Sequence, residues 1–292
     1  MSVGTTADFA LTRNDIIASA LRKVRGWPED GNPPTHRIRE AIRALNLIVR
    51  TEDLKQTDLS KSLWAYSTTY LDLAVKRAIY SSSQSLPEIR ELDTVLVRDT
   101  SGGDVPLDII SPSAYASLAQ KNDTGVPSKV YLKEARLRTS NTLFINPVPS
   151  SVTAGDSVTV SNVLYTCILG HTSSTENKPA TGASYSLYWR NDGAHVAADD
   201  WATATDYSNG DLLVLHYKRP LYDFDLQYDN PDFPLGWEDY FIYKLAIRLA
   251  PEYDLGMDRR QELKNDLAQI SAEIFPSTRQ KTNTYHNKTC FF

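Results

Sequence analysis

The segment "LFINPVPSSV" (143–152) decides how the chain is expected to be organised. Leu143 to Asn146 read as a strand that Pro147 and Pro149 end, since proline cannot continue a hydrogen-bonded ladder. A matching strand, "DLLVLHYKRPL", does not begin until Asp211. Because hairpin strands are commonly joined by about two to five residues, we expect 141–146 and 211–217 to form one hairpin that carries an inserted module at its tip.

The composition sets broad limits on the protein. A chain of 292 residues with 41% hydrophobic residues is long enough for one large domain or two small ones. A net charge of −5 argues against a protein that wraps nucleic acid through a basic surface. The distant Cys167 and Cys290 form no metal-binding pattern, and neither a membrane span nor a signal peptide is expected. We therefore expect the chain to fold in a cytoplasm.

Helical stripes are expected towards both ends of the chain. Thr12 and Asp15 resemble a capping box, and apolar residues at helical spacing predict helices over 12–25, 35–50, 235–250 and 258–275. Alternating residues in 67–146 and 211–217 predict a β region with a short helix at 111–120. The expected fold class is α+β: a helical bundle of about four main helices plus a small β domain.

Residues 150–205 differ from the rest in composition. Small and polar residues dominate there, and "DSVTVSNVLYTCILG" (156–170) contains two strand-like runs around Ser161 and Asn162. We expect 150–205 to be an inserted small all-β module within a body formed by 1–149 and 206–276, because insertion at an exposed turn adds little closure entropy. The insert should then be separable from its host.

Chemical motifs are scarce. The histidines make no pair at metal-ligand spacing, and no nucleophile elbow, P-loop or GxGxxG occurs. We therefore expect no catalytic residue, no cofactor, no metal site and no enzymatic activity. Acidic residues between Asp223 and Asp239 leave a glycosidase-type carboxylate pair open, but an acidic loop near a helix N-terminus is the favoured interpretation.

Aromatic and basic residues supply the other candidates. Sixteen tyrosines and five tryptophans favour interfaces. The helix over 235–250 is apolar on more than one side, which predicts subunit packing through Trp237, Tyr240, Phe241, Tyr243 and Ile247. Candidates for the surface of the insert are Tyr165, Tyr185, Tyr188 and Trp189; burial in its core is the favoured alternative for Tyr165 and Trp189, and exposure is more expected for Tyr185. For the basic residues on the first two helices, a solvated helix face is favoured over DNA contact: Arg22, Lys23, Arg25, Arg39 and Arg43.

The order of several segments resembles one protein family. The segments are "TRNDIIASALRKVRGW", "SPSAYASLAQ", "GVPSKVYL", "TLFINPVP", "LLVLHYKRPLYDF" and "DFPLGWEDYFIYKLAIRLAPEYDL". Together they resemble the head-to-tail adaptor proteins of tailed bacteriophages, also called head-completion or tail accessory factors, over 10–148 and 206–275. The insert resembles small chitin-binding-type carbohydrate-binding modules through "YTCILGHTSSTENKPATGASYSLYW".

The resemblance implies a structural virion protein at the head–tail junction, assembled in the cytoplasm of a host bacterium. Such a protein forms a homo-oligomeric, dodecameric ring that docks under the portal protein, extends the DNA channel and offers a platform to tail nozzle or tail fibre proteins. Genomic DNA would pass through without sequence-specific binding, and an acidic lining would keep it from sticking. The insert would point outward, where protein contact is preferred to sugar because it has no pair of adjacent tryptophans.

The last segment, 277–292, is expected to be an extended C-terminal docking arm. It lacks apolar periodicity and contains basic residues without acidic ones. We expect it to order on the portal or on a neighbouring subunit, through Arg279, Lys281, Tyr285, Lys288, Phe291 and Phe292. The alternative function is a glycan-binding or glycan-cleaving surface protein that acts through the insert and the acidic 223–239 region.

Overall fold

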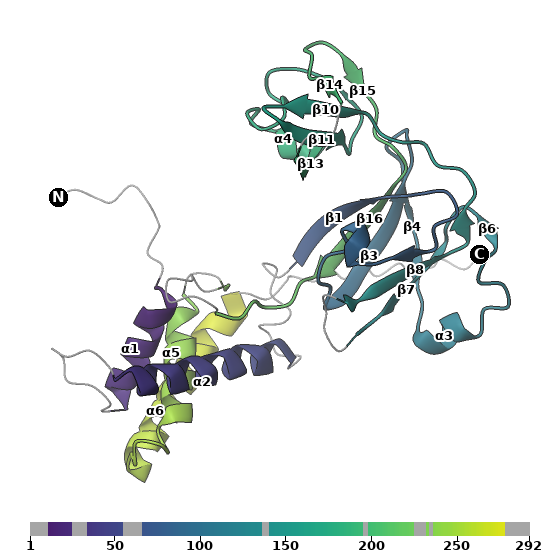
Figure 1. Cartoon of the computed structure of the whole chain (residues 1–292). Coiled ribbons are helices and arrows are strands. Elements are labelled where there is room, and N and C mark those ends of the chain that lie inside the picture. The colour runs from purple at the N-terminus through teal and green to yellow at the C-terminus, as the bar shows by residue number, and fades with distance from the viewer. Residues whose placement is uncertain are drawn as a thin grey trace, which may run out of the picture. The chain divides into compact units, whose positions relative to one another are not determined.

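The chain forms two compact units in a computed structural model (Figure 1). The structure describes residues 11–24, 34–54, 66–135, 140–194, 198–224, 232–233 and 236–277. The first unit combines both ends of the chain, Met1–Ala65 and Pro220–Phe292, and the second is Tyr66–Arg219. The boundaries between the units therefore lie at 65/66 and 219/220, and the insert belongs to the same unit as the strands that flank it.

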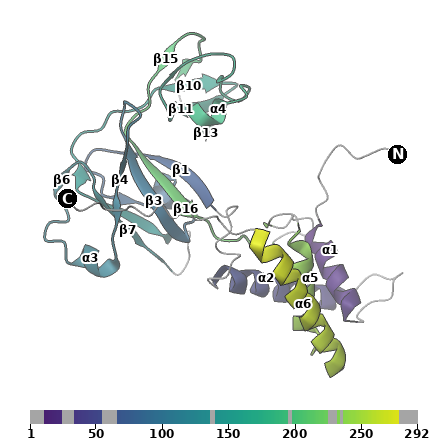
Figure 2. The same ribbon diagram turned by 180° about the vertical axis from the view of Figure 1, so that it is seen from behind.

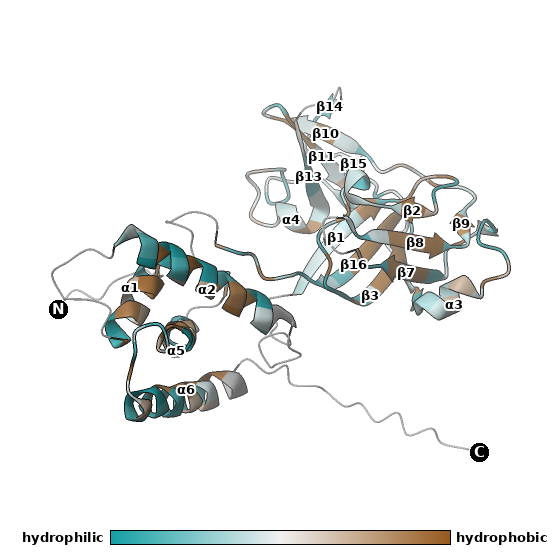
Figure 3. Cartoon of the chain, turned by 60° about the horizontal axis from the view of Figure 1, so that its bottom comes forward, coloured by the Kyte–Doolittle hydropathy of each residue, from teal (hydrophilic) through white to brown (hydrophobic). Residues whose placement is uncertain are grey.

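The helical unit is built around one short central helix. The capping box predicted at Thr12 is confirmed, with the Thr12 amide donating to Asp15 Oδ2 over 3.0 Å. The helix α5 (Glu238–Leu249) contacts α1 (Arg13–Lys23), α2 (Thr35–Leu54) and α6 (Met257–Ser277). Figure 3 shows α5 between α2 and α6, and Figure 2 shows α6 in front of α5 from behind. The core is apolar, and its largest fully buried side chains are Trp237, Phe241, Ile16, Ile17, Leu21 and Leu45.

The segment that returns from the β unit is attached to α2 by polar contacts. The Asn46 amide Nδ2 donates to the Phe224 carbonyl, and its Oδ1 accepts from the Phe224 amide, each over 3.1 Å. Arg50 Nε donates to Asp223 Oδ2 over 2.9 Å at the exposed edge of this contact. These contacts join α2 to residues 223–224, so that two parts of the chain far apart in sequence belong to one unit.

The β unit contains two four-stranded sheets besides the insert. The antiparallel sheet has the order β1–β16–β3–β4: β1 (Tyr66–Asp72), β16 (Leu212–Lys218), β3 (Glu91–Arg98) and β4 (Asp104–Pro106). The mixed sheet has the order β2–β8–β7–β5: β2 (Ile79–Tyr80), β8 (Thr142–Asn146), β7 (Lys129–Lys133) and β5 (Asp108–Ile109). A parallel pair joins β6 (Thr124–Gly125) to β9 (Val148–Pro149). Two short helices complete this part, the 3₁₀ helix η3 (Ser82–Gln84) and α3 (Pro112–Ala116), which Ser111 caps.

The predicted hairpin between 141–146 and 211–217 is wrong. The strand β8 pairs with β7 and β2, whereas β16 pairs with β1 and β3, so the two segments lie in different sheets. Both are nevertheless buried, because Leu143, Ile145, Leu213 and Leu215 belong to one apolar cluster. Apolar residues alternate along both segments because both face the same core, although the two strands are not hydrogen-bonded to each other.

The insert forms a four-stranded sheet with the order β13–β11–β10–β14: β13 (Trp189–Ala194), β11 (Val163–Cys167), β10 (Ser157–Val160) and β14 (Asp199–Asp200). The strands β10 and β11 are joined by Ser161 and Asn162, both at positive φ, so the two predicted runs around this turn are confirmed. A second pair joins β12 (His171–Thr172) to β15 (Asp206–Tyr207), and α4 (Tyr185–Tyr188) precedes β13.

The predicted fold class is wrong. The described residues form six α-helices and sixteen strands in five small sheets, with about as much strand as helix, and no four-helix bundle is evident among them. The fold is mixed α/β. The four long helices do not form a mutually packed bundle because α2 and α6 lie on opposite sides of α5 (Figure 3). In the described ranges, no helix is long and apolar enough to cross a membrane.

Candidate functional site

The aromatic residues of the insert mainly form its core. Tyr165 and Trp189, proposed as surface candidates, are only 3% and 2% exposed, so they are not surface residues. Trp189 meets His171 and Tyr207 edge to face, with ring centroids 5.1 Å and 5.0 Å apart. A module of this size has few side chains to bury, which is why its largest rings are needed inside.

The other two candidates of the insert, Tyr185 and Tyr188, are half-buried at the edge of this core. The Tyr188 ring lies 4.6 Å from that of His171. Two aromatic residues that the sequence analysis did not single out, Trp201 and Tyr207, pack against the same core. Lys178 lies 5.2 Å from the centroid of the Trp201 ring, a cation–π arrangement. None of these rings forms a flat exposed pair for a sugar in the described part of the insert.

A clamp holds the insert to the host sheet through Arg190. The Arg190 guanidinium donates to two host groups, Asp72 Oδ2 over 2.8 Å and the Tyr70 carbonyl over 3.1 Å. It also donates to Asp192 Oδ1 of its own strand over 2.5 Å, which holds the guanidinium in place. The arginine side chain is 21% exposed and that of Asp192 is 22% exposed. Burial opposes the charge of Arg190, yet hydrogen bonds to Asp192 and Asp72 outweigh it and raise the pKa of the guanidinium. A lone Arg between strand residues gave no sequence signal for this role.

A second set of contacts joins the insert to the end of β3. Asn209, 1% exposed, donates from Nδ2 to the Asp99 carbonyl over 2.6 Å and accepts the Gly170 amide over 3.0 Å. Arg98 donates to the Ile168 carbonyl over 3.2 Å while it pairs with Asp104 at 2.7 Å. The insert is therefore attached by side chains as well as by its two connecting segments.

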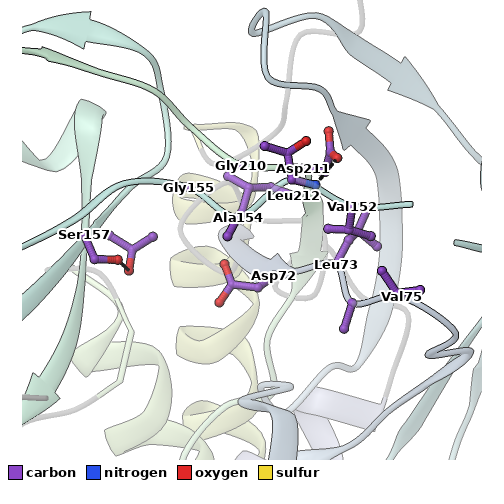
Figure 4. A pocket seen from close by; sticks show the side chains of 13 residues that line it. Asp72, Leu73, Val75, Val152, Ala154, Gly155, Ser157, Gly210, Asp211 and Leu212 are labelled. Atoms are coloured by element: carbon purple, nitrogen blue, oxygen red, sulfur yellow. Dashed lines mark hydrogen bonds between the residues drawn. The ribbon is translucent and has the colours of Figure 1, made fainter. Parts of the chain in front are cut away.

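A pocket of about 410 Å³ lies where these connecting segments leave the host sheet (Figure 4). Its lining comes from the end of β1, the segment before β10 and the start of β16, and includes Asp72, Val75, Val152, Ala154, Ser157 and Asp211. Asp211 Oδ2 accepts the Thr153 amide over 2.8 Å. Of the two carboxylates in this lining, Asp211 thus closes the stem of the insert and Asp72 accepts from Arg190. The described lining residues therefore form no arranged set of catalytic groups.

The packing residues predicted on α5 are used differently from one another. Trp237, Tyr240 and Phe241 are at most 4% exposed and belong to the core of their own unit, whereas Tyr243 and Ile247 are half-buried. The Tyr240 hydroxyl donates to Glu52 Oε2 over 3.0 Å, and Lys244 reaches both groups. Only Tyr243 and Ile247 therefore retain area for a neighbouring subunit. The helix is apolar on several sides because three helices of its own unit contact it.

The described residues contain no group of His, Cys, Asp or Glu side chains arranged to hold a metal ion. Cys167 is buried in the insert, and burial raises the pKa of its thiol to about 12, so it is not a reactive nucleophile. The docking residues predicted in the arm, 278–292, lie outside the described residues, as do Arg25 and most of 225–235. The comparisons give no further lead: no family model matches the chain, and no curated protein matches it.

Proposed function

We propose that the protein is a structural adaptor of a tailed-phage virion, which docks as a ring on the portal and carries the tail. The observation that supports this most directly is the clamp of the insert. The hydrogen bonds of Arg190 to Asp72 and of Asn209 to the Asp99 carbonyl join the module to its host sheet in addition to its two connecting segments. Such attachment suits a protein whose task is to present surfaces at set positions within an assembly.

The adaptor role and its partners are proposed from the sequence resemblance over 10–148 and 206–275. The proposed partners are further copies of the chain, the portal protein, and nozzle or fibre proteins of the tail, with DNA passing through the channel. The glycan alternative is less well supported, because Tyr165 and Trp189 are buried and cannot stack on a sugar. No specific contact on the insert favours it.

The test is reconstitution with the portal protein of the same phage. We expect the full-length chain to bind portal rings in a fixed ratio, visible as an added ring in electron micrographs and as a discrete complex by mass measurement. A chain truncated after Pro276 should fail to dock because it lacks the arm. Docking of the truncated chain as tight as that of the full-length chain would overturn the role of the arm, and failure of the full-length chain would overturn the adaptor function.

The glycan alternative has its own discriminating experiment. The full-length chain is passed over chitin and over peptidoglycan, beside a Tyr188→Ala variant that changes a half-buried ring and leaves the core residue Trp189 in place. The adaptor proposal expects no tight retention of either protein. Tight retention of the wild type that the substitution removes would favour the sugar-binding function.

A further inference from the structure

Two exposed helix faces of the helical unit carry opposite charge. The basic face of α2 consists of His36, Arg39, Arg43, Leu47 and Arg50. One acidic residue, the exposed Glu40, borders this face at spacings of four residues from His36 and three from Arg43. The acidic face of α6 consists of Asp258, Glu262, Asp266, Gln269 and Glu273. Spacings of three and four residues place each set on one side of its helix. Asp266 is half-buried and the other nine residues are exposed, so both faces are open to solvent.

The two faces match in length as well as in charge. At 1.5 Å of rise per residue, the basic face extends over roughly 21 Å and the acidic face over roughly 22 Å. They cannot neutralise one another within one copy, because α2 and α6 lie on opposite sides of α5 (Figure 3). Each copy therefore presents one strip of each sign, on different sides of the same unit.

Much of this charge is not used inside the unit. Among the described residues, Arg39 and Arg43 take part in no ion pair, and neither do Asp258 and Glu273. Arg50 is partly neutralised by Asp223, and Glu262 by Arg259 at 2.5 Å. Leu47 lies on the basic face between Arg43 and Arg50 and is 43% exposed, so an apolar side chain lies within a charged strip. A partner that covers the strip would bury it.

We propose that the acidic face of α6 in one copy binds the basic face of α2 in the next copy. Because the two faces differ and lie on different sides of the unit, this contact is heterologous, and its repetition builds a ring if the rotation closes. The inference deepens the proposed function, since it names the surface through which copies of an adaptor would associate. A duplex nucleic acid fits the observations less well, because it would engage the basic face alone and leave the acidic face without a partner.

The experiment reverses each face in the full-length chain. One variant carries Arg39→Glu with Arg43→Glu, and the other carries Asp258→Lys with Glu273→Lys. The control carries Arg22→Glu with Lys264→Glu, two reversals at exposed positions of the same unit that lie on neither face. Self-association is measured by sedimentation velocity over a concentration series at low and high salt, and folding of each variant is checked by circular dichroism.

We expect the wild type and the control to associate at low salt and to dissociate as salt rises. Each face variant should associate at least about tenfold more weakly, because attraction at two positions becomes repulsion. An equal mixture of the two variants should associate again, since the acidic α2 of one then meets the basic α6 of the other. A merely misfolded variant could not be rescued in this way.

Three results would overturn the interface. These are a wild type that stays monomeric at every salt concentration, face variants that associate like the control, or a mixture that does not recover. If the α2 variant loses binding to a short DNA duplex while its self-association is unchanged, the basic face is a nucleic-acid surface instead. Copies that associate as expected but fail to dock on portal would contradict the adaptor function and leave the interface intact.

Discussion

The clamp at Arg190 can be tested with Arg190→Met, which keeps a long apolar stem and removes the guanidinium. The contact with Asp192 joins two side chains that are 21% and 22% exposed, so its loss should cost about 1.5–3 kcal/mol, the range for hydrogen bonds to charged groups. The contact with Asp72 contributes less, about 0–1 kcal/mol, because that carboxylate is 60% exposed and screened by solvent. The expected destabilisation is therefore about 1.5–4 kcal/mol, most of it from the Asp192 contact within β13.

The loss of stability in Arg190→Met should be seen first as local opening of the insert, before the whole protein unfolds. Hydrogen exchange should quicken at the amides of β11 and β13, the strands of the insert that lie next to the clamp, while the amides of the helical unit keep their rates. Denaturant unfolding gives the total change in free energy. Asp72→Asn should cost under about 1 kcal/mol because its partner keeps Asp192.

The matched control is Arg77→Met, since Arg77 is exposed in the same unit and lies 6.0 Å from the Tyr80 ring centroid without an ion pair among the described residues. It should change the free energy of unfolding by less than about 0.5 kcal/mol. An Arg190→Met protein that unfolds and exchanges like the Arg77→Met protein would refute the clamp.

Three further predictions concern the insert and the two cores. Deleting 154–209 and joining Thr153 to Gly210 should leave a host that still unfolds cooperatively in calorimetry, because the Asp211 amide donates to the Thr153 carbonyl over 2.9 Å and the cut ends are already adjacent; non-cooperative unfolding would show that the insert is part of the host core. Tyr240→Phe should destabilise the helical unit by about 1–2 kcal/mol in denaturant unfolding, since Glu52, 1% exposed, loses a hydrogen bond; a neutral substitution would contradict this. Because burial raises the pKa of Cys167 to about 12, its stabilising effect is complete below the thiol pKa of the unfolded chain, near 8.5, and is lost as pH rises towards 12. In a Cys290→Ser protein, alkylation by iodoacetamide at pH 9 should therefore require unfolding, and rapid labelling of the folded protein would show that the thiol is not buried.

Local features of the fold could be predicted from the sequence because neighbouring residues determine them. The capping box at Thr12 depends only on Asp15, three positions further on. The turn between β10 and β11 depends only on Ser161 and Asn162, which adopt positive φ. Strand pairing could not be predicted in the same way. Residues 141–146 and 211–217 share an apolar cluster, and alternation reports burial on one face without saying which strand is the neighbour.

The sites were hardest to predict because the same residue type serves opposite purposes. Trp189 and Tyr165 in a small module could be exposed for binding or buried as core, and the structure shows burial. No sequence pattern marks the role of Arg190, since its partner Asp72 is far away in the sequence. The charged faces of α2 and α6 are visible in the sequence as helical stripes, but their placement on opposite sides of α5 needed the fold.

The way the insert is attached narrows what it can do for the rest of the protein. Its stem is closed by close backbone approach, since a Cβ on Gly155 would lie 2.6 Å from the Gly210 amide nitrogen, so both connecting segments leave the host at one point. A module held at one point can swing, as an inserted binding domain on a flexible tether does. Arg190 adds a second contact, with Asp72 at the end of β1, and Asn209 adds a third at the Asp99 carbonyl. These added contacts oppose such swinging, so a partner bound to the insert should meet the host sheet in a narrower range of orientations than a single tether would allow.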